Sequence, residues 1–192
     1  MNVHSDRESQ LLTAAIRLSA RVGADGFSMK ALAQEAGLAV GTAYGHFDNR
    51  EELLTAAYRR CVTEVAQVMC GALEPHCDYR ENYRNVWMAF WEYCLANPDT
   101  MLCHEQFNAL PSAQSPEMWA FKLQEFSALS DWLSQTPEIR SLPEPLIAAV
   151  CFDPVVRLAR LKLSGQLKDP ESLRETLFQA TLAALTHETN ND

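Results

Sequence analysis

Apolar residues recur every three or four positions along most of the chain, a spacing that predicts amphipathic helices. The first such run extends from about Arg7 to Val22, and glycines at positions 23 and 26 end it. Between residues 28 and 54 two short apolar faces flank Gly37, where the chain must turn sharply. Glycine enters the left-handed region at little cost, so this stretch predicts two short helices, a tight turn and the start of another helix.

The remaining pattern predicts six more helices. They cover about 50–73, 79–96, a stretch from 98, 116–135, 145–164 and 170–187. Four segments (97–99, 115–117, 136–138 and 169–171) each place a capping side chain, a proline and an acid in succession, which predicts a helix start. Pro154 predicts a kink, because proline removes a backbone hydrogen bond. No segment alternates apolar and polar residues as a strand does, so we expect an all-α protein of about nine helices.

Two short helices around Gly37 are the layout of a helix-turn-helix, whose second helix enters the major groove of DNA. Thr42, Tyr44 and His46 carry groups that hydrogen-bond to phosphates, and Ser28 is expected to cap the first short helix. Val40 offers only methyl groups, and Gly45 has no side chain to read a base. The residues predicted to meet DNA are Ser28, Lys30, Val40, Thr42, Tyr44, Gly45, His46 and Arg50.

The runs 36–38 (Ala-Gly-Leu), 41–47 (Gly-Thr-Ala-Tyr-Gly-His-Phe) and 49–54 (Asn-Arg-Glu-Glu-Leu-Leu) resemble the TetR/AcrR family of transcriptional regulators over about residues 8–60. The resemblance implies phosphate contacts for Tyr44 and His46. It also implies a ligand-responsive repressor that binds palindromic operator DNA as a homodimer. Two positions depart from the family pattern: Ala39 replaces a capping serine, and Gly45 stands where a large base-reading side chain is common.

We therefore expect a three-helix DNA-binding domain over residues 1–50 and a larger helical domain for ligand binding and dimerisation over residues 51–192. Aromatic residues concentrate in the middle of the second part, which predicts either core packing or the walls of a cavity for an apolar or aromatic effector. The candidate ligand-binding residues are Trp87, Phe90, Trp91, Cys94, Phe107, Trp119 and Phe126. Residues 104–106 (His-Glu-Gln) are candidate polar anchors or solvated side chains.

Apolar stripes run along the last two predicted helices, within about residues 145–187. In the resembled family these helices form a four-helix bundle between two copies of the chain. The same stripes also suit a helix pair that only covers its own domain, so the sequence leaves both interpretations open.

The net charge of −9 is unusual for a DNA-binding protein, but it is unevenly distributed. Residues 1–60 hold seven Lys or Arg and seven Asp or Glu, so the excess of acid lies after residue 60. A neutral domain still binds phosphates when its cations face one side. The chain has no apolar run of the ~20 residues that span a membrane, and its first residues are polar; we expect a cytoplasmic protein without membrane contact.

Six cysteines match no zinc-binding spacing, and we predict no metal and no cofactor. Buried thiols are the simplest interpretation; a thiol redox sensor is the alternative, with Cys103 beside His104 as its best candidate. The common hydrolase, zinc-protease, P-loop and dinucleotide-binding motifs are missing from the sequence, so an enzyme is not expected. A helical enzyme or carrier with a vestigial helix-turn-helix is the remaining alternative.

Overall fold

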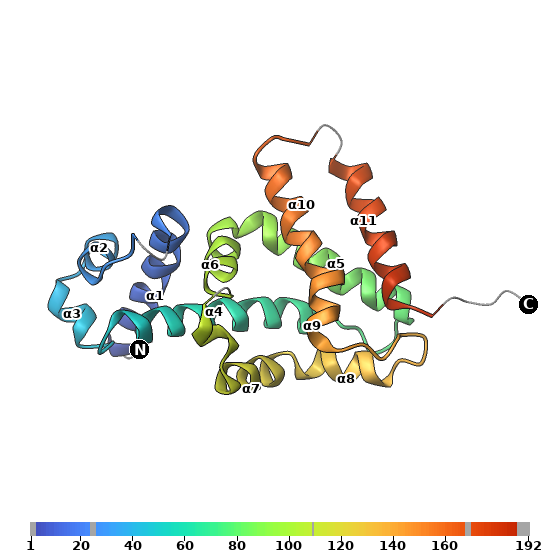
Figure 1. Ribbon diagram of the computed structural model, residues 1–192, viewed down its shortest axis with the longest axis horizontal. Coiled ribbons are helices and arrows are strands. Elements are labelled where there is room, and N and C mark those ends of the chain that lie inside the picture. Colours follow the sequence, from blue (N-terminus) through green and yellow to red (C-terminus); the bar gives the residue numbers. More distant parts are fainter. Residues whose placement is uncertain (1–2, 24–25, 109, 168–169, 188–192) are drawn as a thin grey trace, which may run out of the picture. The chain divides into compact units, whose positions relative to one another are not determined.

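A computed structural model describes residues 3–23, 26–108, 110–167 and 170–187, and in these residues the regular structure is helical (Figure 1). The all-α prediction is confirmed. The elements in chain order are α1 (Val3–Val22), α2 (Met29–Glu35), α3 (Val40–Tyr44), α4 (Arg50–Gly71), α5 (Tyr79–Ala96), α6 (Pro98–Asn108), the 3₁₀ turn η1 (Pro111–Gln114), α7 (Pro116–Glu125), α8 (Ser127–Gln135), α9 (Glu144–Ile147), the π-helical segment η2 (Ala148–Phe152), α10 (Asp153–Leu163) and α11 (Pro170–Leu185).

The chain forms two compact units, and each contains segments that are distant in sequence. The first unit comprises residues 1–64 and 98–122, and the second comprises residues 65–97 and 123–192. Helix α6 therefore belongs to the same unit as the predicted helix-turn-helix, because it packs along α1. The functional boundary proposed at residue 50 stays a prediction.

In the first unit, α1 packs against both α2 and α6, and α2 packs against α3. Its buried side chains follow the helical spacing of the sequence, as at Leu11, Ala15 and Leu18 on α1. Leu32, Ala43 and Phe47 contribute the buried face of the helix-turn-helix. Burial of these apolar side chains holds the short helices in place, since helices of five to seven residues are unstable alone.

In the second unit, α5 packs against α10 and α11, and α11 also contacts η2. The core here is aromatic. The Trp87 and Trp91 rings stack with centroids 6.2 Å apart, and Phe178 meets the edge of Trp87 at 5.7 Å. Tyr83 stacks on Phe178, and Phe152 lies against both Tyr83 and Phe90.

Residues 116–135 form two helices where the sequence predicts one. The break lies at Phe126, whose ψ of 12° leaves the helical range. The Cys70 thiol approaches the Glu125 carbonyl at the break, with the sulfur 3.8 Å from the oxygen. The Cys70 side chain on α4 thus lies against the Glu125 carbonyl at the break. Because the two residues are 55 positions apart, the local sequence carries no signal for this contact.

Where the sequence predicts a kink near Pro154, a π-helical segment covers Ala148–Phe152, directly before α10. Pro154 lacks the amide hydrogen that would reach the carbonyl four residues earlier, so the hydrogen-bond ladder changes its spacing there. The structure therefore divides the predicted helix 145–164 into α9, η2 and α10.

Three of the four proline-marked helix starts are correct, at Pro98, Pro116 and Pro170. The fourth is wrong, because residues 137–140 do not form a helix. Ile139 instead forms an isolated antiparallel bridge with Thr186, and the Arg140 amide donates to the Leu185 carbonyl at 2.9 Å. Pairing with the end of α11 outweighs the local capping signal.

Candidate nucleic-acid interface

The turn between α2 and α3 is closed by two backbone hydrogen bonds around Gly37. The Gly37 amide donates to the Gln34 carbonyl at 3.2 Å, and the Leu38 amide donates to the Ala33 carbonyl at 2.9 Å. This is the Schellman arrangement, which needs a left-handed residue after the helix. Gly37 has φ +66°, and glycine adopts this value without strain.

Helix α3 buries one side and exposes the other. Ala43 is fully buried, Phe47 just beyond the helix is 5% exposed, and both belong to the core. On the opposite side Val40 is 39% and Tyr44 54% exposed. The two exposed residues are four positions apart, so they share one helix face.

The other predicted contacts lie around this face. Thr42 and His46 are half-buried, whereas Lys30 and Arg50 are exposed. Gly45 is exposed at the end of α3, and a Cβ atom there would lie 3.4 Å from the nearest atom, the Thr42 carbonyl oxygen. A Cβ atom on Gly41 would have no neighbour within 4 Å. The two glycines thus leave this exposed part of α3 without side chains.

Capping differs between the two short helices. Ser28 caps α2 as predicted, because its hydroxyl oxygen accepts a hydrogen bond from the Ala31 amide at 3.1 Å. Ala39 precedes α3 and gives it no side-chain cap. The first amides of α3 therefore lack a capping side chain, in agreement with the departure noted in the sequence.

Two residues that the sequence interpretation missed fix the start of α4. The Asn49 side chain accepts from the Glu52 amide at 2.9 Å, and the Glu52 carboxylate accepts from the Asp48 amide at 2.6 Å. This reciprocal pairing resembles a capping box. The spacing Asn-x-x-Glu is its sequence signal, and it holds Arg50 at the first position of α4.

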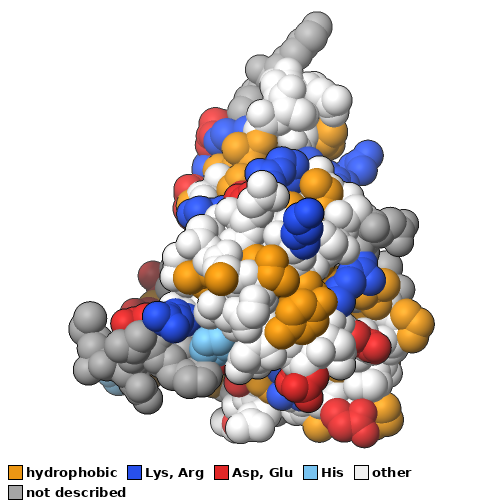
Figure 2. All heavy atoms as spheres, turned by 90° about the vertical axis from the view of Figure 1, so that its left-hand side faces the viewer, with side chains coloured by type: hydrophobic (Ala, Val, Ile, Leu, Met, Phe, Trp, Pro, Cys, Tyr) orange, Lys and Arg blue, Asp and Glu red, His pale blue; other side chains and the backbone are white. Residues whose placement is uncertain are grey.

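Figure 2 shows the side of the molecule on which α2 and α3 lie in Figure 1. Lys and Arg side chains are dispersed among uncharged and hydrophobic ones, and they do not gather into one large patch. The even balance of charge over residues 1–60 agrees with this distribution.

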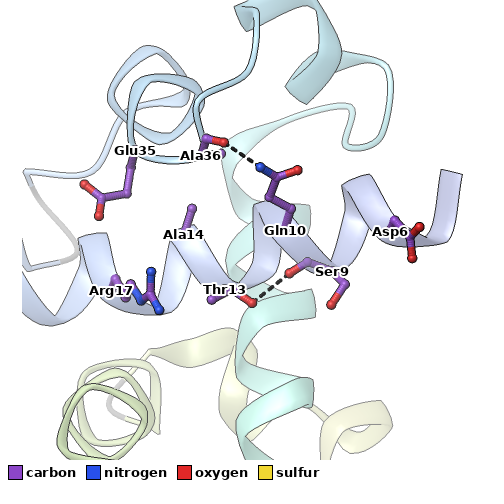
Figure 3. Close-up of a pocket in the computed structure, with 8 residues that line it drawn as sticks. All are labelled: Asp6, Ser9, Gln10, Thr13, Ala14, Arg17, Glu35 and Ala36. Atoms are coloured by element: carbon purple, nitrogen blue, oxygen red, sulfur yellow. Dashed lines mark hydrogen bonds between the residues drawn. The ribbon is translucent and has the colours of Figure 1, made fainter. Parts of the chain in front are cut away.

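A groove of about 400 Å³ lies between α1 and the end of α2 (Figure 3). Gln10 crosses this groove, and its side-chain amide donates to the Ala36 carbonyl at 2.8 Å. Beyond Gln10, Arg17 and Glu35 lie on facing walls. The hydrogen bond gives a partner to a carbonyl at the end of α2 and links α1 to α2.

The candidate ligand-binding residues fall into both units. Trp87, Phe90, Trp91 and Cys94 lie on α5 in the second unit and are at most 5% exposed. Phe126, at the junction of α7 and α8, is half-buried in the same unit. Phe107 and Trp119 belong to the first unit, where Phe107 packs on Tyr58 with ring centroids 6.4 Å apart and Trp119 is 42% exposed.

Of the polar anchor candidates, His104 packs beside the Tyr58 ring with centroids 5.3 Å apart. Burial, and secondarily the nearby Lys122 ammonium, lower the pKa of His104 to about 4. The side chain is therefore neutral near pH 7. In the described part of the chain no three His, Cys, Asp or Glu side chains are grouped in a way that would hold a metal ion. None of the described helices combines the length and apolarity needed to cross a membrane.

Comparison with known proteins supports this geometry in both parts of the chain. Residues 11–57 match the model for bacterial regulatory proteins of the tetR family, and residues 78–186 match the model for the tetracyclin repressor-like C-terminal domain. An uncharacterized HTH-type transcriptional regulator of Haemophilus influenzae is 34% identical over 112 residues, which are 56% of this chain and 58% of that protein. The nicotine-responsive transcriptional repressor HdnoR of Paenarthrobacter nicotinovorans is 29% identical over 86 residues, 45% of this chain and 44% of that one.

The chain thus spans about half the length of the curated relatives it matches. Solved structures match more completely. A TetR family transcription regulator from Marinobacter aquaeolei VT8 superposes with a TM-score of 0.86 at 25% identity, covering 97% of this chain and 99% of that one. A putative TetR family regulator from Vibrio parahaemolyticus gives 0.79 at 25% identity, covering 93% and 98%. The two family models and the outward-facing helix α3 lead to one conclusion: the chain belongs to the TetR family of bacterial transcriptional regulators.

Proposed function

We propose that this regulator is a repressor that binds a palindromic operator as a homodimer and is released by a small molecule. The observation that carries the DNA-binding part is the exposure of Val40 and Tyr44 on one face of α3, opposite the buried Ala43. A short helix held by its other face and exposing an aromatic side chain suits insertion into the major groove.

Each residue has a distinct part in this proposal. Tyr44, His46 and Thr42 donate hydrogen bonds to phosphates, and Arg50 adds a charge at the start of α4. Val40 contacts a thymine methyl group, and Lys30 reaches a base edge or a phosphate near the first turn of α2. The Ser28 hydroxyl retains its proton for a phosphate while its oxygen caps α2. Gly41 and Gly45 allow the backbone to approach the DNA closely, so DNA shape contributes to specificity.

Selection of bound duplexes from a random pool tests the DNA-binding part directly. We expect a palindrome whose half-sites lie about one helical turn or more apart. Tyr44→Phe removes only the phenolic hydroxyl and should weaken binding to all sequences alike. Arg50→Gln should reduce the salt dependence of log K by ~1. Recovery of random duplexes, or of sites without two-fold symmetry, would refute the proposal.

Dimerisation is assigned to α10 and α11, which pack against each other and lie side by side in Figure 1. Leu163 near the end of α10 is 51% exposed, and Leu173 in the first turns of α11 is 42% exposed. Exposed leucines on adjacent helices favour a second copy of the same helix pair as their cover.

The effector is assigned to the aromatic core of the second unit. The indole N–H groups of Trp87 and Trp91 are buried, and neither has a hydrogen-bond acceptor among the described residues. Buried donors of this kind are rare, because each lost hydrogen bond costs about 1–3 kcal/mol. We therefore infer an effector with an apolar or aromatic body and a hydrogen-bond acceptor. A relative named as nicotine-responsive supports control by a small molecule.

Tryptophan fluorescence can measure the binding of a candidate effector, because Trp87 and Trp91 lie in the aromatic core to which the effector is assigned. Thermal-shift screening of aromatic acids, ketones and heteroaromatic amines supplies probes. Trp87→Phe keeps a ring in the core but removes the donor, so it should weaken a probe that uses that donor. Trp132→Phe, on α8, is the matched control. A true effector must lower the affinity of the protein for operator DNA. By reciprocity, operator DNA must lower the affinity of the protein for that effector by the same factor. A probe that stabilises the protein without this mutual effect would contradict the assignment.

A further inference from the structure

The exposed face of α3 has few side chains that form hydrogen bonds. Val40, Gly41, Tyr44 and Gly45 are all exposed, and their spacing places them on one side of the helix. Ala39, directly before the helix, is exposed as well. Among these five residues the Tyr44 hydroxyl is the only side-chain group that donates or accepts a hydrogen bond. The face is therefore mainly apolar or without side chains.

This composition limits which bases the face can distinguish. Guanine, adenine and cytosine are read in the major groove through hydrogen bonds, which arginine, lysine, asparagine, glutamine and the acidic residues supply. None of the five residues of α3 (Val-Gly-Thr-Ala-Tyr) is of these types. Thymine also presents its C5-methyl group, which apolar side chains contact. Val40 therefore matches a methyl group better than it matches a hydrogen-bonding edge.

We propose that Val40 determines specificity by reading the C5-methyl group of a pyrimidine, and that 5-methylcytosine can replace thymine at the contacted position. The inference rests on the proposed function, because it requires α3 to lie in the major groove. It adds that methylation of cytosine at C5 raises operator affinity. The observation that carries it is the 39% exposure of Val40 on a helix without amide, guanidinium or carboxylate side chains.

The two bases carry the same methyl group but differ at C4. Thymine has a carbonyl oxygen there, which accepts hydrogen bonds, whereas cytosine has an amino group, which donates them. A side chain must itself donate or accept a hydrogen bond to tell these groups apart. The Val40 side chain does neither, and the Tyr44 hydroxyl is assigned to a phosphate. A readout of thymine by Val40 is consequently also a readout of cytosine methylation.

The two glycines beside Val40 support a close approach to the base edges. A Cβ atom at Gly41 would meet nothing within 4 Å, and one at Gly45 would approach only carbonyl oxygens, at 3.4 and 3.5 Å. Both positions therefore have room for an alanine, which favours a helix more than glycine does. Larger residues there would stand between α3 and the DNA, whereas glycine lets a side chain as short as valine reach a methyl group.

The expected effect follows from the apolar surface that one methyl group removes from water. Loss of one buried methyl group should weaken binding about 4-fold. A palindrome presents each contacted position twice, once in each half-site, so the symmetric loss should be about 15-fold.

The experiment uses the full chain and the operator recovered by selection. Each thymine is replaced in turn, in both half-sites, by deoxyuridine, which lacks only the methyl group. Anisotropy at a fixed salt concentration should show the about 15-fold loss at a thymine that Val40 contacts. At the same position 5-methylcytosine paired with guanine should restore most of the affinity, whereas unmodified cytosine should bind as weakly as deoxyuridine.

The variant Val40→Ala shortens the side chain and should remove the difference between thymine and deoxyuridine at that position. Val22→Ala is the matched control, because Val22 on α1 is 41% exposed and has no assigned contact with DNA. The control should keep the full difference. The substitutions in DNA test the readout with the unaltered protein, so the test does not depend on how the variants fold.

Three results would overturn the inference. They are full affinity for an operator in which every thymine is deoxyuridine, a 5-methylcytosine that binds no better than cytosine, and a methyl effect that persists in Val40→Ala. Failure of the selection to yield any operator is a separate result, seen before any base is modified, and it would refute the proposed function itself.

Discussion

The side-chain oxygen of Asn49 accepts a hydrogen bond from the backbone amide of Glu52, 2.9 Å away, at the point where α4 begins. Removing this acceptor by Asn49→Ala should destabilise the protein by about 1 kcal/mol, as for other N-caps. It should also weaken operator binding, because Arg50 is the first residue of α4. Asn49→Ser keeps an acceptor and should retain most of the stability and affinity. Chemical denaturation and anisotropy measure both effects; equal losses in the two variants would contradict the capping role.

Gly41 is predicted to lower the stability of the folded protein and to allow a close approach of the α3 backbone to DNA. It lies inside α3 with open space around its Cβ position, so Gly41→Ala should raise the free energy of unfolding by about 0.5–1 kcal/mol. The added methyl group should at the same time lower operator affinity by obstructing the approach of the backbone. Gly71→Ala is the control, since Gly71 is the last residue of α4 and its Cβ position is likewise surrounded by open space. A Gly41→Ala protein with full operator affinity would argue against a close contact.

His104 should make the stability depend on pH. Its pKa in the folded chain is about 4, compared with an ordinary histidine pKa of 6.5, so the unfolded chain binds more protons in the interval between them. Stability should therefore be complete above about pH 6.5 and decrease as the pH falls toward about 4. Between pH 7 and 5 the loss from this group is at most about 2 kcal/mol.

His104→Phe keeps a ring beside Tyr58 and removes the titrating group, so the difference in unfolding free energy between pH 7 and pH 5 should shrink. The exposed His76 supplies the control variant His76→Phe, which should leave that difference unchanged. An NMR titration of His104 giving a pKa above 6 would show the burial argument to be wrong.

Leu173 should distinguish a dimer interface from an ordinary surface. Leu173→Lys places an ammonium group on α11, and a charge buried without a partner at an interface is strongly unfavourable. Sedimentation at micromolar concentration should then change from dimer to monomer. Leu123→Lys on α7 is the matched control, because Leu123 is 43% and Leu173 42% exposed. Identical sedimentation of both variants and the parent would remove α11 from the interface.

Sequence reasoning succeeded where the signal is local. Pro98, Pro116 and Pro170 start helices, and Ser28 and Gly37 cap and turn the chain, because each depends only on the next few residues. The family pattern extended this accuracy to the whole helix-turn-helix. The Asn49–Glu52 pairing was equally accessible from its spacing.

The errors arise where distant segments decide the outcome. The helix start at Pro137 fails because Ile139 bridges to Thr186, and the break at Phe126 is matched by a thiol on another helix. The aromatic candidates form a single cluster in sequence but belong to two units in space.

The π-helical segment Ala148–Phe152 should also be a place where this chain tolerates the insertion or deletion of one residue. A π turn joins residues five apart where an α turn joins residues four apart, so it holds one residue more than the α-helix around it. Deleting Ala149, which is exposed, would let the segment close as an α-helix while α10 keeps its face toward α5. The same deletion within α10 would rotate every following side chain by about 100°. Insertions and deletions among related chains should therefore collect at this one turn.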